Sequence, residues 1–121
     1  MVVDDEVAVL ETLERQLRRS GHVVHVAHNA AEAIETLGSH EVDVALVDLV
    51  MPGKGGLTLI MENLSSKPDL MVVAMSGRLP VGTDSMKSLG GTLGISCYLG
   101  KPFTQEELDR AIATALARSC A

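Results

Sequence analysis

Short apolar runs alternate with segments of helical periodicity along almost the whole chain, and this alternation limits the possible folds more than any other feature. The apolar runs lie at residues 2–3, 23–27, 42–48, 70–75 and 97–99. Apolar side chains spaced three and four residues apart predict helices over 6–20, 30–38, 57–64, around 83–93, and from Thr104 onwards. Strands that alternate with helices favour a parallel sheet joined by right-handed crossovers.

Five such units predict an α/β fold, a flavodoxin-like doubly wound five-stranded parallel sheet with helices on both faces. The expected strand order is 2-1-3-4-5. In this order the first and third strands are neighbours, and the chain changes its winding direction between them. Ligands of such sheets bind at this point, beyond the carboxyl ends of the strands.

Local signals agree with these elements. Gly21 follows the first helical segment in the position of a helix stop. Thr104 and Glu107 have the spacing of a capping box that opens the last helix. Apolar residues make up 46% of the 121 residues, which is enough for one core. We therefore expect a single domain over residues 1–121, either standing alone or as a fragment of a longer protein.

The charge of the chain argues against direct binding to nucleic acid. The net charge is −6, whereas nucleic-acid affinity depends on cations that neutralise phosphates. Arg15, Arg18 and Arg19 gather at the end of one predicted helix, where they suit the helix dipole. We interpret them as a solvated last turn and not as a DNA-binding patch.

The cysteines and the first residues predict a cytoplasmic location. Cys97 and Cys120 are too few for a disulfide framework, and they lack the spacing of a metal site. The chain begins without the basic and apolar segments of a signal peptide. No apolar run approaches the roughly 20 residues that span a bilayer, so no membrane insertion is expected.

Acidic residues follow the two apolar runs that the predicted sheet places side by side. Asp4 and Asp5 come after the first run, and Asp48 ends the third. Three carboxylates that converge repel one another, and a hard cation such as Mg²⁺ relieves the repulsion. Each acid alone could be an ordinary surface residue, but acids at matched strand ends favour a metal site.

The last two apolar runs also end in polar residues. Ser76-Gly77 follows the fourth run, and Lys101-Pro102 follows the fifth. Alone, these are most simply a turn and a lysine that reaches solvent. At the same sheet edge as the acids, however, they add a hydroxyl donor and an ammonium that can pair with phosphate or carboxylate.

Taken in order, the motifs "VVDDE", "VDLVMPGKGGL", "MSG" and "CYLGKPF" resemble the receiver domain of response regulators. The resemblance covers nearly the whole chain, and the combination is specific although no single motif is. It implies a signalling module of a two-component system, not a dedicated enzyme, phosphorylated on Asp48 by a histidine kinase or phosphotransfer protein. It also implies autodephosphorylation, Mg²⁺ as cofactor, and an output domain or partner protein of unknown identity.

The resemblance also implies a metal-ligand set. Asp5 would bind Mg²⁺ directly and Asp4 largely through water. Asp48 and the main-chain carbonyl of Val50 would be further ligands.

The remaining motif residues take roles around the phosphoryl group. Lys101 would bind a phosphoryl oxygen and hold the region of Asp48. Ser76 would bond the phosphoryl group after its transfer, and Tyr98 stands at the aromatic switch position. The alternative for Tyr98 is a core aromatic with its hydroxyl at the surface. The peptide bond before Pro102 would be cis.

The chain departs from the family pattern in several places. The first strand is short, and the loop after Ser76 is longer than in the commonest members. Gly90 and Gly91 weaken the predicted fourth helix, which with strand five and helix five would form the output surface. Ser96 and Cys97 stand where many members carry the acidic residues of an ion-paired dimer, so that dimer is not expected.

Two other functions stay open. A Mg²⁺-dependent phosphohydrolase also uses an aspartate nucleophile, but it places a DxD motif on the first strand and adds a cap domain. This chain has adjacent Asp4-Asp5 and no room for a cap. A pseudo-receiver would only dock partners. The retained acids, Ser76 and Lys101 argue against it, and failure to bind Mg²⁺ would argue for it.

Overall fold

A computed structural model describes residues 1–49, 55–60, 62, 69–76, 95–101 and 103–119. Five parallel strands form one sheet in the order β2-β1-β3-β4-β5, which confirms the predicted topology. The strands are β1 (Val2–Val3), β2 (Val26–Ala27), β3 (Val44–Asp48), β4 (Met71–Ser76) and β5 (Ile95–Gly100).

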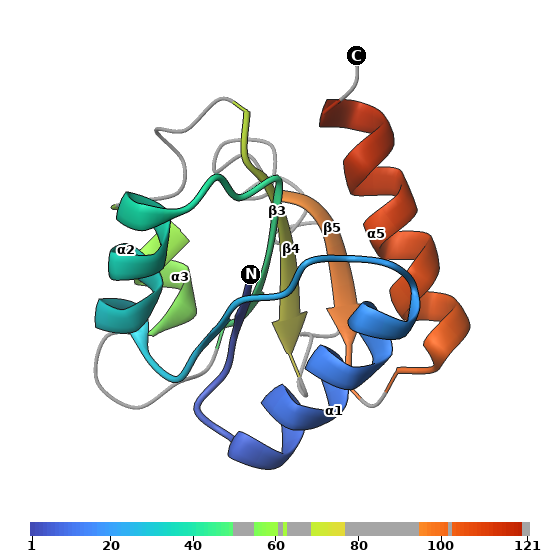
Figure 1. Cartoon of the computed structure of the whole chain (residues 1–121), viewed down its shortest axis with the longest axis horizontal. Helices are drawn as coiled ribbons and strands as arrows, with labels where there is room; N and C mark the ends of the chain where they lie inside the picture. Colours follow the sequence, from blue (N-terminus) through green and yellow to red (C-terminus); the bar gives the residue numbers. More distant parts are fainter. Residues whose placement is uncertain (50–54, 61, 63–68, 77–94, 102, 120–121) are drawn as a thin grey trace, which may run out of the picture.

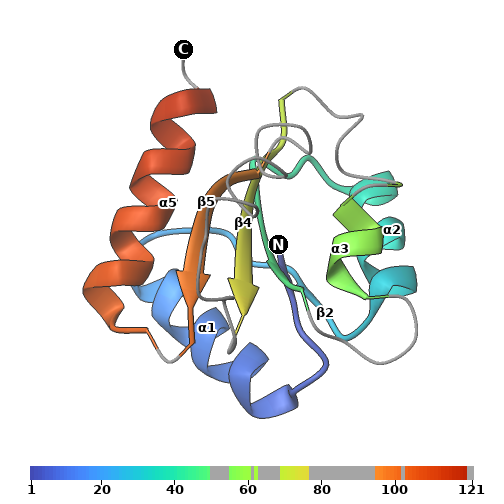
Figure 2. The same ribbon diagram turned by 180° about the vertical axis from the view of Figure 1, so that it is seen from behind.

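Helices cover both faces of the sheet. α1 (Val7–Arg19) and α5 (Gln105–Ser119) lie on one face, and α2 (Ala30–Ser39) and α3 (Gly56–Leu59) lie on the other (Figures 1 and 2). Each face has its own core. The α1–α5 side buries Val2, Leu10, Leu13, Leu46, Val73, Leu108 and Ile112. The α2–α3 side buries Val3, Ala30, Ala33, Val47, Leu59, Ile60 and Ala74. Adjacent strand residues thus face opposite cores, as the pleat of a strand requires.

Side chains and a glycine fix the ends of the helices. Gly21 has φ of 91°, a left-handed conformation that favours glycine and stops α1. At the start of α5, the Glu107 N–H donates to Thr104 Oγ1 at 3.1 Å, and the Thr104 N–H donates to Glu107 Oε1 at 3.2 Å. These reciprocal bonds confirm the predicted capping box.

The predicted second strand over 23–27 is too long, because β2 contains only Val26–Ala27. Its partner β1 has two residues, and a ladder cannot extend beyond its shorter strand. Val23, predicted in the strand, is 85% exposed. β3 begins at Val44 and not at residue 42, while β5 extends beyond the predicted 97–99. The predicted helix around 83–93, the two cysteines' side chains, and the end of the helix over 57–64 lie outside the described residues.

No helix within the described ranges is both long enough and apolar enough to cross a bilayer.

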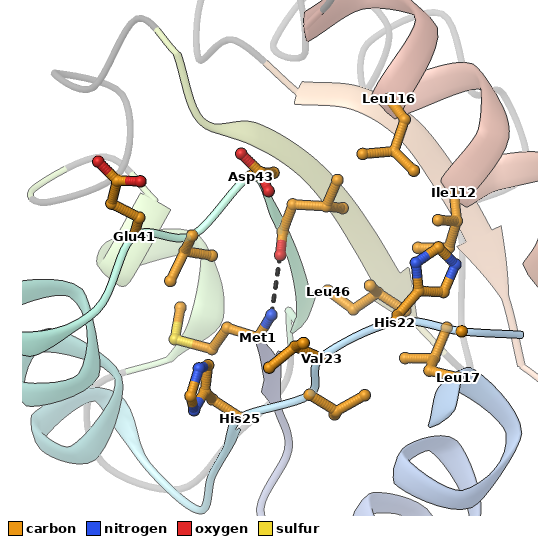
Figure 3. A pocket seen from close by; sticks show the side chains of 14 residues that line it. Met1, Leu17, His22, Val23, His25, Glu41, Asp43, Leu46, Ile112 and Leu116 are labelled. Carbon is orange, nitrogen blue, oxygen red and sulfur yellow. Dashed lines mark hydrogen bonds between the residues drawn. The ribbon is translucent and has the colours of Figure 1, made fainter. Parts of the chain in front are cut away.

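The terminal ammonium of Met1 is buried beside the amino end of β3. It donates a hydrogen bond to the carbonyl oxygen of Val44 at 2.9 Å, and it lines a cavity of about 270 Å³ (Figure 3). Burial lowers the pKa of this ammonium from 8.0 to about 6, although the Asp43 carboxylate opposes the shift.

For the 121-residue polypeptide with a free α-amino group at Met1, we expect the free energy of unfolding to fall as the pH drops from 8 to 6. The unfolded chain protonates Met1 near pH 8.0, whereas the folded chain does so only near pH 6, so protons favour unfolding in this window. The loss is at most about 2–3 kcal/mol, since one pKa unit corresponds to about 1.4 kcal/mol. Urea unfolding at a series of pH values measures it.

The control separates Met1 from His25, whose pKa is lowered by burial and by nearby His40, and which titrates in the same direction. Both the free chain and its Nα-acetylated form should carry His25→Gln. Acetylation is expected to remove most of the remaining slope between pH 6 and 8. An unchanged slope would contradict the assignment to Met1.

Candidate functional site

The register of the central strands brings the predicted acids together. Val3 of β1 is paired with Val47 of β3, so the next residues, Asp4 and Asp48, lie side by side at the carboxyl ends of these strands. Oxygens of Asp4, Asp5 and Asp48 lie within 4.8 Å of one another. The convergence predicted from the strand order is therefore present in the structure.

The three carboxylates differ in exposure. Asp4 is completely buried, Asp48 is 5% exposed, and Asp5 is exposed. Asp4 Oδ1 accepts the main-chain N–H of Glu6 at 2.9 Å, which ties the acid to the residue that precedes α1. Buried carboxylates need such partners, because an uncompensated charge away from water is costly. Asp5 reaches the same cluster from the solvent side.

Lys101 supplies the compensating positive charge. Its main-chain N–H donates to the Ser76 carbonyl at 2.8 Å, which continues the pairing of β5 with β4. Its Nζ donates to Asp4 Oδ2 at 2.5 Å and to Asp48 Oδ2 at 3.2 Å. Burial by itself lowers the pKa of Lys101, but the bonds and charges of Asp4 and Asp48 outweigh it and raise that pKa. Lys101 is thus held as a cation between two acids.

The residues present fit a magnesium ion. Three carboxylates share the cluster, and among the described residues Lys101 is the cation bonded to them. Oxygen donors with partial access to solvent suit Mg²⁺, which binds through a few carboxylates and keeps several waters. Val50, whose carbonyl was predicted as a further ligand, lies outside the described residues, as does Pro102 of the predicted cis peptide.

Ser76 and Tyr98 lie on neighbouring strands next to this cluster. Ser76 is the last residue of β4, is 3% exposed, and is paired with Gly100, directly before Lys101. Tyr98 is paired with Ala74, two residues before Ser76. Its ring is partly buried against the core on the α2–α3 side, and burial raises the pKa of its phenol. The core contact that belongs to the alternative predicted for Tyr98 is present.

A groove opens next to Lys101 on the α1 side of the sheet. Its volume is about 480 Å³, and it is lined by Ala8, Val9, Thr12, Leu13, Gln16, Lys101 and Phe103. The first five residues lie on α1, and the last two follow β5. A mostly apolar surface therefore borders the acidic cluster.

Gly56 makes a close approach to Asp48 that the local sequence pattern did not predict. A Cβ atom at Gly56 would lie 1.8 Å from the carbonyl oxygen of Asp48. The sequence did contain one signal of this close approach: a glycine directly before the helix predicted over 57–64, soon after Asp48.

Comparison with known proteins gives a consistent result. The family model described as the response regulator receiver domain matches residues 1–113. Response regulator MprA of Mycobacterium ulcerans is 37% identical over 108 residues, which cover 89% of this chain and 45% of MprA. Regulatory protein VanR of Enterococcus faecium is 30% identical over 118 residues, covering 98% and 49%. The chain thus spans about half the length of these curated relatives.

Two solved receiver structures share the fold over nearly their whole length. A CheY-like receiver domain protein from Methanospirillum hungatei has a TM-score of 0.87 at 22% identity, covering 98% of this chain and 92% of that chain. Response regulator TrrA from Thermotoga maritima, solved in complex with Mg(2+)-BeF, has a TM-score of 0.79 at 26% identity, covering 94% and 95%. The chain belongs to the response regulator receiver domain family of two-component signal transduction, whose general property is phosphorylation on an aspartate.

Proposed function

We propose that Asp48 is the phosphoacceptor of this receiver domain and that its phosphorylation depends on Mg²⁺. The observation that carries the proposal is the position of its carboxylate. It is buried at the end of the central strand, clusters with Asp4 and Asp5, and lies 3.2 Å from the Lys101 ammonium. No other described Asp or Glu belongs to a comparable cluster.

Asp5, Asp4 and Asp48 would hold the ion, with Asp5 bound most directly because it faces solvent. When bound, Mg²⁺ supplies positive charge next to the oxygens of the incoming phosphoryl group. Support comes from TrrA, a 26% identical neighbour that was solved with Mg(2+)-BeF.

The protein's own groups account for the transfer. An oxygen of the Asp48 carboxylate attacks phosphorus in line, and the bond from phosphorus to the donor breaks, so an acyl phosphate forms on Asp48. Lys101 turns its ammonium from Asp4 and Asp48 towards a phosphoryl oxygen and neutralises charge in the transition state. Attack by water later returns the carboxylate and releases phosphate.

The new phosphoryl oxygens would act as the switch. Ser76, at the adjacent strand end, would donate its hydroxyl to one of them. Movement of Ser76 would change the packing around Tyr98, because Ser76 lies in β4 and Tyr98 lies in β5, the strand paired with it. We expect the surface of β5 and α5, together with the helix predicted around 83–93, to respond, and a partner protein or output domain to read the change.

The phosphoryl donor would be a histidine kinase or a phosphotransfer protein. The groove between α1 and Phe103 supports this proposal, since it offers a protein partner apolar surface directly beside Lys101. We regard the chain as one signalling domain, without direct binding to nucleic acid, insertion into membranes or a substrate of its own, and we expect it in the cytoplasm.

Incubation with acetyl phosphate and Mg²⁺ tests the function. The intact mass is expected to rise by one phosphoryl group that hydroxylamine removes, and a chelator should prevent the gain. A phosphohydrolase would instead turn over small phosphomonoesters without stable labelling. A pseudo-receiver would neither bind Mg²⁺ nor take up the label.

Asp5→Ala is expected to weaken Mg²⁺ binding by more than about tenfold, because loss of even an indirect metal partner costs 10- to 100-fold. Without Mg²⁺ the variant should be at least as stable as the parent, since one of three mutually repelling carboxylates is gone. Calorimetric titration with Mg²⁺ measures the affinity. Glu35→Ala, which removes an exposed acid from α2, is the matched control. Equal affinities for the parent and Asp5→Ala would refute the ligand assignment.

A further inference from the structure

Gly56 differs sharply from Gly21 and Gly38 in the space around its α-carbon. A Cβ atom added to Gly56 would lie 1.8 Å from the Asp48 carbonyl oxygen, 2.7 Å from the Asp48 carbonyl carbon and 2.9 Å from Val47 Cγ1. The same atom at Gly21 or Gly38 would meet nothing within 4 Å. Gly56 is buried and is the first residue of α3. The start of this helix therefore rests on the main chain of Asp48.

The peptide unit that follows Asp48 is held from its opposite side. The Leu49 N–H donates to the carbonyl oxygen of Met75 in β4 at 2.9 Å. In a planar trans peptide the N–H and the carbonyl point in opposite directions. The Asp48 carbonyl thus points away from β4 and towards Gly56, and the peptide is fixed between β4 and α3.

We propose that Gly56 is a positioning residue for the Asp48 carboxylate: the bare α-carbon of Gly56 sets the main chain of Asp48, and through it the carboxylate's place beside Asp4 and Lys101. The inference rests on the proposed role of Asp48 as phosphoacceptor. It adds that α3 and β4 together fix the position from which the Asp48 carboxylate attacks phosphorus.

A methyl group at Gly56 cannot be accommodated by a side-chain rotation, because the nearest atoms belong to the main chain. The contact must open from 1.8 Å to at least 3.0 Å, a movement of about 1.2 Å. If α3 does not lift away, the Asp48 peptide tilts, and the carboxylate moves relative to Lys101 Nζ, which now lies 3.2 Å away. Misplacement of a reacting group by about 1 Å can cost 100-fold in rate.

The experiment compares Gly56→Ala with Gly38→Ala, which adds the same methyl to a glycine in open space at the end of α2. Phosphorylation by acetyl phosphate at saturating Mg²⁺ is followed at 10 °C over a range of donor concentrations. Each rate is divided by the folded fraction from a urea unfolding curve of the same variant. This normalisation removes any effect of stability alone.

We expect the maximal rate of folded Gly56→Ala to fall by about 100-fold, with little change in the acetyl phosphate concentration for half-maximal rate. Gly38→Ala should stay within about twofold of the parent. A normalised rate for Gly56→Ala within about threefold of the parent would overturn the proposal. A Gly56→Ala chain that is unfolded at 10 °C would also overturn it, because Gly56 would then be needed for the fold itself.

Failure of the underlying function is distinguishable from failure of this inference. If the parent chain and Gly38→Ala take up no label, the role of Asp48 is wrong. If both are labelled on Asp48 and folded Gly56→Ala is labelled equally fast, only the positioning role is wrong.

Discussion

Asp48→Asn is expected to take up no phosphoryl group from acetyl phosphate and Mg²⁺, whereas the parent chain takes up one. The amide has nearly the shape of the carboxylate but lacks the nucleophilic oxygen that forms the acyl phosphate. The variant should fold, because the substitution removes one of the clustered negative charges and leaves Asp4 to pair with Lys101. Intact-mass measurement before and after hydroxylamine reports the result.

Asp43→Asn is the matched control for this experiment. It makes the same chemical change one residue before β3, whereas Asp48 ends the strand. Its labelling should equal that of the parent. If Asp48→Asn is labelled as strongly as the parent, the phosphoacceptor is another residue, and peptide mapping of the labelled chain would identify it.

Lys101→Met should slow phosphorylation strongly and also destabilise the fold. Loss of one donor aimed at developing charge typically costs 100- to 1,000-fold in rate. The same change leaves the completely buried Asp4 without its ammonium. Breaking a buried ion pair costs about 3–5 kcal/mol, and we expect about 2–3 kcal/mol because the Lys101 side chain is 19% exposed. Methionine keeps the length of the stem, so the change is mainly one of charge.

Added Mg²⁺ should restore part of the stability of Lys101→Met, since a cation among the three carboxylates replaces the lost charge and binds the folded state. Urea unfolding with and without Mg²⁺ measures both effects. Arg19→Met, which removes an exposed cation from the last turn of α1, should show neither. If Lys101→Met matches the parent in phosphorylation rate and in stability, the Lys101 ammonium does not have the central role proposed for it.

The order of the elements and the location of the site could be predicted from the sequence. The spacing of apolar residues and the positions of helix-capping and helix-ending residues are local properties, so they can be recognised in the sequence without a structure. Because the strands are parallel, their carboxyl ends share one edge of the sheet. The acids after the first and third apolar runs therefore had to meet, with Ser76 and Lys101 at the next strand ends. The capping box of Thr104 and the stop at Gly21 were predictable for the same reason.

Other features depended on contacts between distant segments. The length of β2 follows from its pairing with a two-residue β1, so the apolar run over 23–27 could not reveal it. The low pKa of the Met1 ammonium comes from its burial beside Val44, which no local pattern encodes. In both cases the contact depends on how β1 is paired with its neighbouring strands.

The arrangement inside the site was also decided by the tertiary structure. The residues alone indicated that Lys101 could pair with a carboxylate, but only the register of four strands brings its ammonium to 2.5 Å from Asp4 and 3.2 Å from Asp48. Nor could the sequence show that the start of α3 packs so closely against the Asp48 carbonyl that Gly56 has no room for a Cβ atom. Sequence determined which groups meet at the sheet edge, because strand order fixes that. The distances and close contacts between these groups could be known only from the tertiary structure, because they depend on how helices and strands from separate segments pack against one another.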